Sequence, residues 1–227
     1  MALRREPAKT AGGKAVPARG APAAATASAE SRRLTKGERT RARLLEAAEF
    51  VFEQGSYDEA SIVEITRKAG VSQGTFYLYF PSKLEIFREV VRALSHELRS
   101  HIAVRIAGIE SRAEVERRGF EAFFAFVKEH PGLYRIIRQA EFVDRDIYRY
   151  HYERLAEGYR RGLRDAVHRG EFRDLDPEVL AYTLMGIGEL IGARWLLWED
   201  APAGKVPAKV VDTVIDIVMN GVLTPRR

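Results

Sequence analysis

The sequence predicts an all-α protein with nine helices, and three observations support that prediction. From Lys36 onwards apolar residues recur every three to four positions, which is the period of an amphipathic helix. Gly and Pro residues interrupt this pattern at intervals and mark the ends of helices. A strand-like alternation of apolar and polar residues nowhere extends beyond a few positions, and no internal repeat is present. A helical fold without a sheet is therefore expected.

The first predicted helix covers about residues 37–54. Its apolar positions follow helical spacing and stop at Gly55; they are Leu44, Leu45, Ala48, Val51 and Phe52.

Residues 61–83 predict two short helices joined by a tight turn. The first helix has one apolar face, formed by Ile62, Ile65 and Ala69. Gly70 can take the positive φ that such a corner needs, and Ser72 can cap the helix that follows. That second helix turns inward through Val71, Phe76 and Phe80, and it leaves outside Gln73, Thr75, Tyr77 and Tyr79. A short helix with an apolar back and a hydrogen-bonding front suits the major groove of DNA.

Six further helices follow from the same pattern and its interruptions. Pro81 and Ser82 open a long helix that ends at Gly108, and Asp176-Pro177 opens the eighth, with Pro in its favoured first position. The remaining helices are expected over about 112–129, 133–140, 144–168 and 207–222, and the eighth extends to Trp198. We divide the chain into a disordered basic tail (1–34), a helix-turn-helix DNA-binding domain (35–83) and a C-terminal effector-binding and dimerisation domain (84–227).

Composition excludes several classes of site. The chain has 227 residues, 46% of them apolar, which is normal for a globular protein. Cysteine is absent, and the five His residues form no HxxxH or HxxH pair, so no metal or other cofactor is expected. No window approaches the roughly 20 unbroken apolar residues of a membrane span, so we expect a cytoplasmic protein without a membrane partner.

The positive charge lies in the tail. The whole chain has a net charge of +5, and residues 1–34 alone hold seven Lys/Arg and two Asp/Glu. The tail is rich in Ala, Pro and Gly and cannot bury enough surface to fold; it is a flexible solvated segment or a basic arm that adds nonspecific attraction to phosphate. It lacks the apolar stretch of a secretory signal, so it is not an export sequence. Its composition also resembles a transit peptide, but nothing else in the sequence favours that interpretation. Net charge therefore does not show that the folded part binds nucleic acid.

The run LLEAAEFVFEQGSYDEASIVEITRKAGVSQGTFYLYFPSKLEIF, residues 44–87, resembles the N-terminal domain of TetR (tetracycline-repressor-like) transcriptional regulators. The apolar spacing, the AGVS turn, the GTFYLYF helix and the PSK helix start occur in the family's order, and nine helices suit the family. The resemblance implies a homodimer that binds a palindromic operator on double-stranded DNA and releases it when a small molecule enters the C-terminal domain. Thr66 and Tyr79 depart from the common pattern, in which Ala and His are frequent.

The resemblance also implies which residues meet DNA. Gln73, Gly74 and Thr75 match positions that read base edges, and Ser72 caps that helix. Tyr77 and Tyr79 match phosphate or base contacts. Ser61 and Lys83 match phosphate contacts, in agreement with the anion-binding character of helix N-termini. Basic residues cluster near these helices, and we expect them to form a basic face rather than an evenly solvated surface; they are Arg39, Arg41, Arg43, Arg67, Lys68 and Lys83.

In the family the last two helices pair with their copies, and this chain has matching apolar stripes. The expected interface residues are Leu184, Gly188, Ile191, Trp195, Val211, Val214 and Val218. The alternative is that they face the core of their own protomer.

The middle of the chain is rich in aromatic residues, as apolar ligand sites are, although aromatic residues at helical spacing are also ordinary core. The candidate ligand-binding residues are Phe120, Phe123, Phe124, Ile137, Glu141, Tyr148 and Tyr152. Arg138 and Arg194 are further polar candidates. Helices six and seven resemble those of members that respond to apolar acids or acyl-coenzyme A.

Two other functions stay open at this point. An enzyme in a helical scaffold would need a nucleophile–base set, and the sequence offers only ordinary pairs such as Glu129–His130. A nonspecific DNA-compacting protein would depend on the tail. Removal of residues 1–34 separates that function from a repressor, which would keep its operator specificity.

Overall fold

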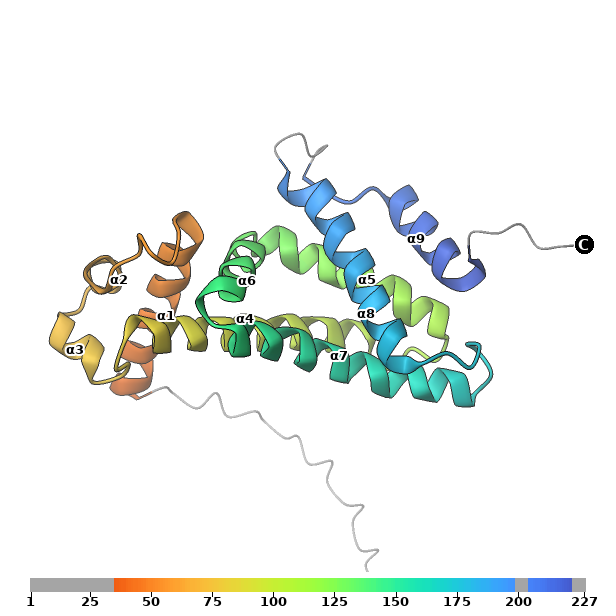
Figure 1. Cartoon of the computed structure of the whole chain (residues 1–227), viewed down its shortest axis with the longest axis horizontal. Coiled ribbons are helices and arrows are strands. Elements are labelled where there is room, and N and C mark those ends of the chain that lie inside the picture. The colour runs from red at the N-terminus through yellow and green to blue at the C-terminus, as the bar shows by residue number, and fades with distance from the viewer. Residues whose placement is uncertain (1–34, 199–203, 222–227) are drawn as a thin grey trace, which may run out of the picture. The chain divides into compact units, whose positions relative to one another are not determined.

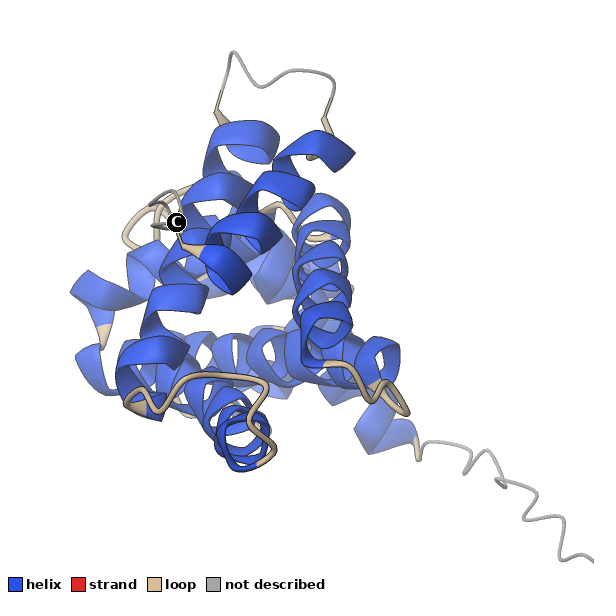
Figure 2. Ribbon diagram, turned by 90° about the vertical axis from the view of Figure 1, so that its right-hand side faces the viewer, coloured by secondary structure: helices blue, strands red, loops and turns tan. Residues whose placement is uncertain are grey.

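In the computed structural model, residues 35–198 and 204–221 are described. Within these ranges the chain forms nine α-helices and no strand, which confirms the predicted all-α class (Figures 1 and 2). The predicted tail lies outside the described residues, as does the predicted helix end at Val222. The chain from Thr35 onwards belongs to one compact unit.

The helix bounds agree with the sequence prediction to within about three residues. They are α1 Lys36–Gln54, α2 Ile62–Ala69, α3 Gln73–Tyr77, α4 Lys83–Ile106, α5 Arg112–Glu129, α6 Gly132–Val143, α7 Arg145–His168, α8 Pro177–Gly192 and α9 Ala208–Asn220. A π-helical turn, Ala193–Leu197, continues α8. The sixth helix is longer than predicted because it runs directly into α7. Asp144 ends α6 and caps α7 by accepting hydrogen bonds from the N–H groups of Asp146 and Ile147.

Helices α1 to α4 enclose the first apolar core. Phe52, Ile65, Phe76 and Phe87 are fully buried there. Burial of a side chain of this size stabilises a fold by about 1.5–3 kcal/mol. The same core continues without a break into α6, through residues such as Ile136. A second core joins α5, α7, α8 and α9, which lie at the other end of α4 from α3 (Figure 1).

Polar side chains of α6 also attach to the end of α1. The last carbonyl groups of a helix lack partners within the helix. Arg135 Nη1 donates to the carbonyl of Glu53 at 2.6 Å, and Gln139 Nε2 donates to the carbonyls of Phe52 and Gly55 at 3.1 and 3.2 Å. Helix α6 thus holds the C-terminal end of α1.

Four of the residues expected at the dimer interface face the core of their own protomer instead. Leu184, Gly188, Val211 and Val214 are buried within this single chain, because α8 and α9 pack on α5 and α7 with these positions inward. Gly188 lies against Phe120, where an added Cβ would be 3.3 Å from the ring. The other three expected residues are partly buried: Ile191, Trp195 and Val218.

The apolar face that α8 and α9 leave exposed is a different one. It is formed by Val179, Tyr182, Leu190 and Ile217. The segment Pro177–Leu197 is long and apolar enough to cross a membrane by length and composition alone, although charged residues interrupt it, and 28% of its apolar window is buried. An apolar helix with so little burial needs a further covering surface.

Candidate functional sites

The turn between α2 and α3 is fixed by Gly70 and by a side chain from α1. Gly70 has φ 63° and ψ 42°, as predicted, and the N–H of Val71 donates to the carbonyl of Thr66 at 3.0 Å. The Arg43 guanidinium donates to the carbonyl of Ala69, so a cation also caps the C-terminal end of α2. These contacts set the angle at which α3 leaves the core.

Helix α3 presents its polar residues to solvent. Ser72 caps it by accepting from the N–H of Thr75 at 3.2 Å, and the two hydroxyl groups lie 2.9 Å apart. Gln73, Gly74 and Tyr77 are exposed, whereas Phe76 and Phe80 are buried as predicted.

Leu78, which the sequence analysis passed over, is 81% exposed directly after α3. Leu78 lies between Tyr77 and Tyr79, and only one side of so short a helix can face the core. This position was the indication in the sequence that Leu78 is exposed. The exposed side of α3 together with Leu78, which we call the reading surface, thus contains an apolar side chain.

The remaining expected DNA contacts have partners within the protein. Ser61 forms a capping box with Glu64 at the start of α2. Tyr79 is partly buried, with its hydroxyl near Gly37 in α1. Lys83 Nζ donates to the carbonyls of Tyr57 and Ala60, at 2.7 and 2.9 Å. Lys83 therefore braces the segment before α2.

Two of the basic residues expected on an exposed face make contacts with other side chains at the protein surface. Arg41 pairs with Glu89 on α4, and Lys68 Nζ lies 3.5 Å from the centre of the Phe50 ring. Arg67 is exposed at the end of α2. Arg39, Arg43 and Lys68 are exposed as well, so the basic face expected beside the polar and aromatic surface of α3 stays a prediction.

The second candidate site is a narrow apolar cavity among α4, α5, α6, α7 and α8. Its volume is about 40 Å³, which is room for little more than a water molecule. Its apolar lining is Ile102, Phe120, Phe123, Leu133, Ile137, Leu155, Leu184, Met185 and Gly188. A larger ligand can enter only if these helices move apart.

The polar part of the lining consists of Tyr134, His151, Tyr152 and Glu189, together with Tyr159. Tyr134 donates to the carbonyl of Glu189 at 2.9 Å, and Tyr152 donates to the Glu189 carboxylate at 3.0 Å. Burial, reinforced by that carboxylate, raises the pKa of both Tyr hydroxyls above the ordinary range. His151 Nδ1 lies 2.7 Å from Ser95 Oγ. Burial, with a smaller effect from Arg99, lowers the pKa of His151 to about 4, so its ring is neutral at pH 7.

The structure separates the predicted ligand residues into two groups. Phe120, Phe123, Ile137 and Tyr152 line the cavity. The other three do not, and are Phe124, Tyr148 and Glu141.

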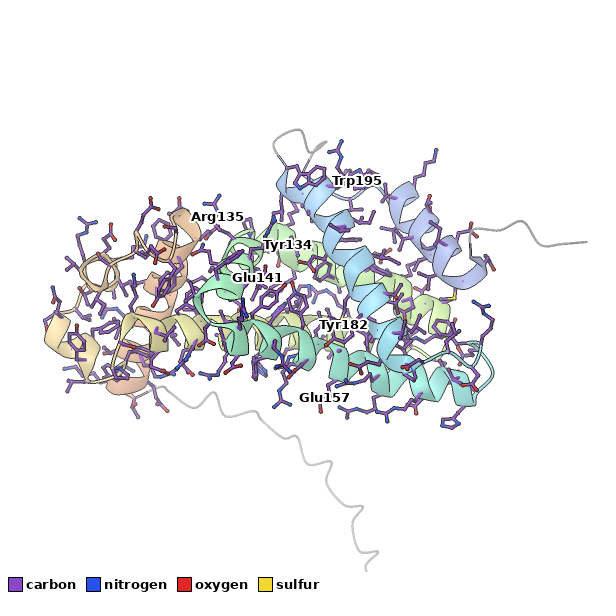
Figure 3. The ribbon with its side chains drawn as sticks, in the orientation of Figure 1. Tyr134, Arg135, Glu141, Glu157, Tyr182 and Trp195 are labelled. Carbon is purple, nitrogen blue, oxygen red and sulfur yellow. The ribbon has the colours of Figure 1, made fainter. Side chains whose placement is uncertain are left out.

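Phe124 is buried in the second core, and Tyr148 contacts the Tyr152 ring from a neighbouring groove. Glu141 is exposed on α6 (Figure 3), because its position places it on the solvent side of that helix. Arg138 lines a surface groove, and Arg194 lies 5.7 Å from the Trp195 ring.

Neither His151 nor Glu189 was among the residues predicted from the sequence. His151 is an isolated His, and Glu189 is the one acidic residue within an apolar stretch of α8. A charged residue at such a position was the available signal.

The fold and the α2–α3 unit define a helix-turn-helix DNA-binding protein. Residues 44–90 match the sequence model of the bacterial regulatory proteins of the tetR family. Over these residues the chain is similar to this family of transcriptional regulators.

Relatives and solved structures agree with this assignment. The chain is 29% identical over 201 residues to YdgC, an uncharacterised helix-turn-helix regulator of Bacillus subtilis, and the match covers 83% of this chain and 95% of YdgC. It is 34% identical over 111 residues to the transcriptional activator FasR of Mycolicibacterium smegmatis, covering 49% of this chain and 50% of FasR. The structure of FadR from Bacillus subtilis in complex with stearoyl-CoA matches with a TM-score of 0.71 and 18% identity. The match covers 80% of this chain and 99% of the FadR chain. That last likeness is one of fold.

Proposed function

We propose that the chain is a homodimeric, cytoplasmic repressor that leaves a palindromic operator when an apolar effector opens the cavity. The observation that carries the proposal is that one side of α6 lines the cavity and the other side contacts the end of α1. Leu133, Tyr134 and Ile137 line the cavity, while Arg135 and Gln139 hold the end of α1. In Figure 3, Arg135 and Tyr134 lie on α6 between α1 and α8. A movement of α6 at the cavity therefore also displaces α1.

The DNA-binding part of the proposal rests on α3. Gln73 can form two hydrogen bonds to adenine, and the exposed Tyr77 hydroxyl can donate to phosphate. The other expected DNA contacts are Ser61, Ser72, Gly74, Thr75, Tyr79 and Lys83. A homodimer would place two copies of α3 in successive major grooves, about 34–36 Å apart.

The dimer part rests on the exposed face of α8 and α9. Val179, Tyr182, Leu190 and Ile217 are apolar and uncovered, and a second copy of the same face would cover them. This exposed face is proposed as the dimer interface in place of the buried residues that the sequence pattern indicated. A substitution such as Leu190→Glu should give a folded monomer with weak operator binding.

The effector part rests on the closed state of the cavity. A ligand that binds only the open state shifts the population towards it, by an amount set by its differential affinity. The lining is mostly apolar, which favours an aliphatic or aromatic effector, and stearoyl-CoA bound to FadR of the same fold supports an acyl compound as a candidate. The proposed role is that of a binding protein and not of an enzyme, in line with relatives that are transcriptional regulators.

The test is fluorescence anisotropy with the DNA upstream of the protein's own gene. We expect salt-sensitive, sequence-specific binding that Gln73→Ala weakens by about 1–3 kcal/mol. Arg164→Gln, on the exposed side of α7, is the matched control and should bind as the unmodified chain does. Equal affinity for this DNA and for shuffled DNA would contradict the proposal. A reporter assay then decides between repression and the activation that the name of FasR indicates for that relative.

A further inference from the structure

A second recess lies beside the cavity, between α4, α5 and α7. Its volume is about 470 Å³, and it shares three lining residues with the cavity: Ile102, Leu155 and Tyr159. Two glycines of its wall, Gly119 and Gly158, have no atom within 4 Å of the position that a Cβ would occupy. The recess is therefore already open where the cavity is closed. We call it the α7 cleft.

The charge of the α7 cleft differs from that of the cavity. Its lining contains four guanidinium groups and two carboxylates, from Arg99, Arg112, Arg154, Arg161, Glu116 and Glu157. Glu157 is labelled on α7 in Figure 3. The lining of the cavity contains one charged side chain, Glu189, because His151 is neutral. An anion is therefore favoured in the cleft and disfavoured in the cavity.

The innermost charged pair of the cleft is incompletely satisfied. Arg112 donates to Glu116, and their side chains are only 8% and 1% exposed. Arg112 Nε is buried without a hydrogen-bond partner in the described part of the chain. A buried donor left in this state costs about 1–3 kcal/mol. The wall of the cleft therefore contains a buried guanidinium whose hydrogen bonding is incomplete.

The rim of the cleft can adapt to an incoming anion. Arg154 pairs with Glu157 at 2.9 Å, but both side chains are about half exposed. Such surface pairs contribute little, at most about 1 kcal/mol, so a bound anion can replace Glu157 as the partner of Arg154. Arg161, which follows Arg154 and Glu157 on α7, is exposed.

We propose that the α7 cleft binds the anionic head, a carboxylate or a phosphate, of an amphipathic effector whose apolar tail enters the adjoining cavity. This inference rests on the proposed function, because it places the two ends of the effector of that same site. The tail would pass between the cleft and the cavity at Leu155 and Tyr159, where the two share their walls. The effector class is then an acidic amphiphile, and neither a neutral drug nor a hydrophobic cation.

Four probes with the same ten-carbon tail test the head group: decyl phosphate, undecanoate, decanol and decyltrimethylammonium. Isothermal titration calorimetry with the full chain at pH 7.5, below the micellar concentrations, compares their affinities. We expect the two anions to bind at least about tenfold more tightly than decanol, a difference of about 1.4 kcal/mol. The cation should bind most weakly. Equal affinity of the anions and decanol overturns the inference, as does the binding of none of the four.

Two rim variants locate the preference. Arg154→Gln and Arg161→Gln should each lower the affinity for decyl phosphate about tenfold and leave decanol unchanged. Arg164→Gln removes the same charge from α7 outside the cleft and should leave both probes unchanged. If the three variants behave alike, the anions are attracted by net charge and the cleft has no specific role.

A steric variant provides an independent check. Gly158→Phe would fill the cleft, while Gly158→Ala adds only a Cβ in open space and favours the helix. Circular dichroism verifies that both fold. We expect Gly158→Phe to lower decyl phosphate affinity at least about tenfold and Gly158→Ala to retain it. Unchanged affinity of Gly158→Phe overturns the inference. The proposed function is decided separately, because DNA binding without any probe does not depend on the cleft.

Discussion

Mild acidification should destabilise the protein through His151. The ring is buried on α7, its Nδ1 lies beside Ser95 Oγ, and the charge of Arg99 adds a smaller lowering of its pKa. Burial lowers its pKa from the ordinary value of about 6.5 to about 4. Because the folded state disfavours the charged ring, the unfolded state binds a proton first as the pH falls. The stabilising effect of the neutral ring is complete above about pH 6.5 and is lost progressively down to about pH 4.

The magnitude follows from these two pKa values. One pKa unit corresponds to about 1.4 kcal/mol of stability. Between pH 7.5 and pH 5.0 the unfolded ring becomes almost fully protonated, whereas about one folded ring in ten does. The free energy of unfolding should therefore fall by about 2 kcal/mol over this interval. For a domain with a typical stability of about 5–15 kcal/mol this is a measurable fraction.

Urea denaturation at a series of pH values, followed by circular dichroism, measures the change. In His151→Asn, whose amide can keep the contact with Ser95, the loss between pH 7.5 and 5.0 should be about 2 kcal/mol smaller. The variant itself is expected to be less stable at pH 7.5, because the smaller side chain leaves a void. His96→Asn, at an exposed position, should keep the full pH dependence. An identical pH dependence in His151→Asn and the unmodified chain would refute the reasoning.

Three substitutions test the other elements. Gly70→Ala forces a side chain into left-handed backbone and places its Cβ 2.9 Å from the Arg43 guanidinium, so urea denaturation should show a loss of about 1–2 kcal/mol. Gln139→Leu removes two hydrogen bonds to the end of α1 and should cost about 1–2 kcal/mol by the same method, with a smaller effect of effector on DNA affinity in anisotropy titrations. Leu78→Ala removes an exposed apolar group from the reading surface; specific DNA affinity should fall by about 1 kcal/mol, with unchanged affinity for shuffled DNA, if Leu78 contacts a thymine methyl group.

The helices and the turn could be predicted from the sequence because their causes are local. Gly70 takes the positive φ expected of it, and Ser72 caps α3 as its position indicated. The buried sides of Phe76 and Phe80 follow from helical period alone. The interface positions on α8 could not be predicted in this way. That helix is apolar nearly all round, so the period does not show which side faces the protomer's own core.

The charged residues were the hardest to place, because their partners are distant in sequence. Lys83 bonds to carbonyls about 25 positions earlier in the chain, and Arg41 pairs with Glu89, 48 positions later. A pattern that reads neighbouring residues cannot supply such contacts. The same holds for Arg112, whose backbone N–H meets Glu171 in the loop after α7. Charge counts along the chain therefore could not show which basic residues pair within the protein.

The hydrogen bonds from α6 to α1 also limit how large a change in DNA affinity an effector can transmit through them. Arg135 and Gln139 make three hydrogen bonds to the end of α1, each with a net contribution of about 1 kcal/mol. An effector that opens the cavity and breaks all three can transmit about 3 kcal/mol through them, which corresponds to a change of roughly 150-fold in DNA affinity. A larger response would require a second route, and the continuous core between α1 and α6 is one such connection. Retention of most of the response in a chain that carries both Arg135→Leu and Gln139→Leu would assign the coupling to that core.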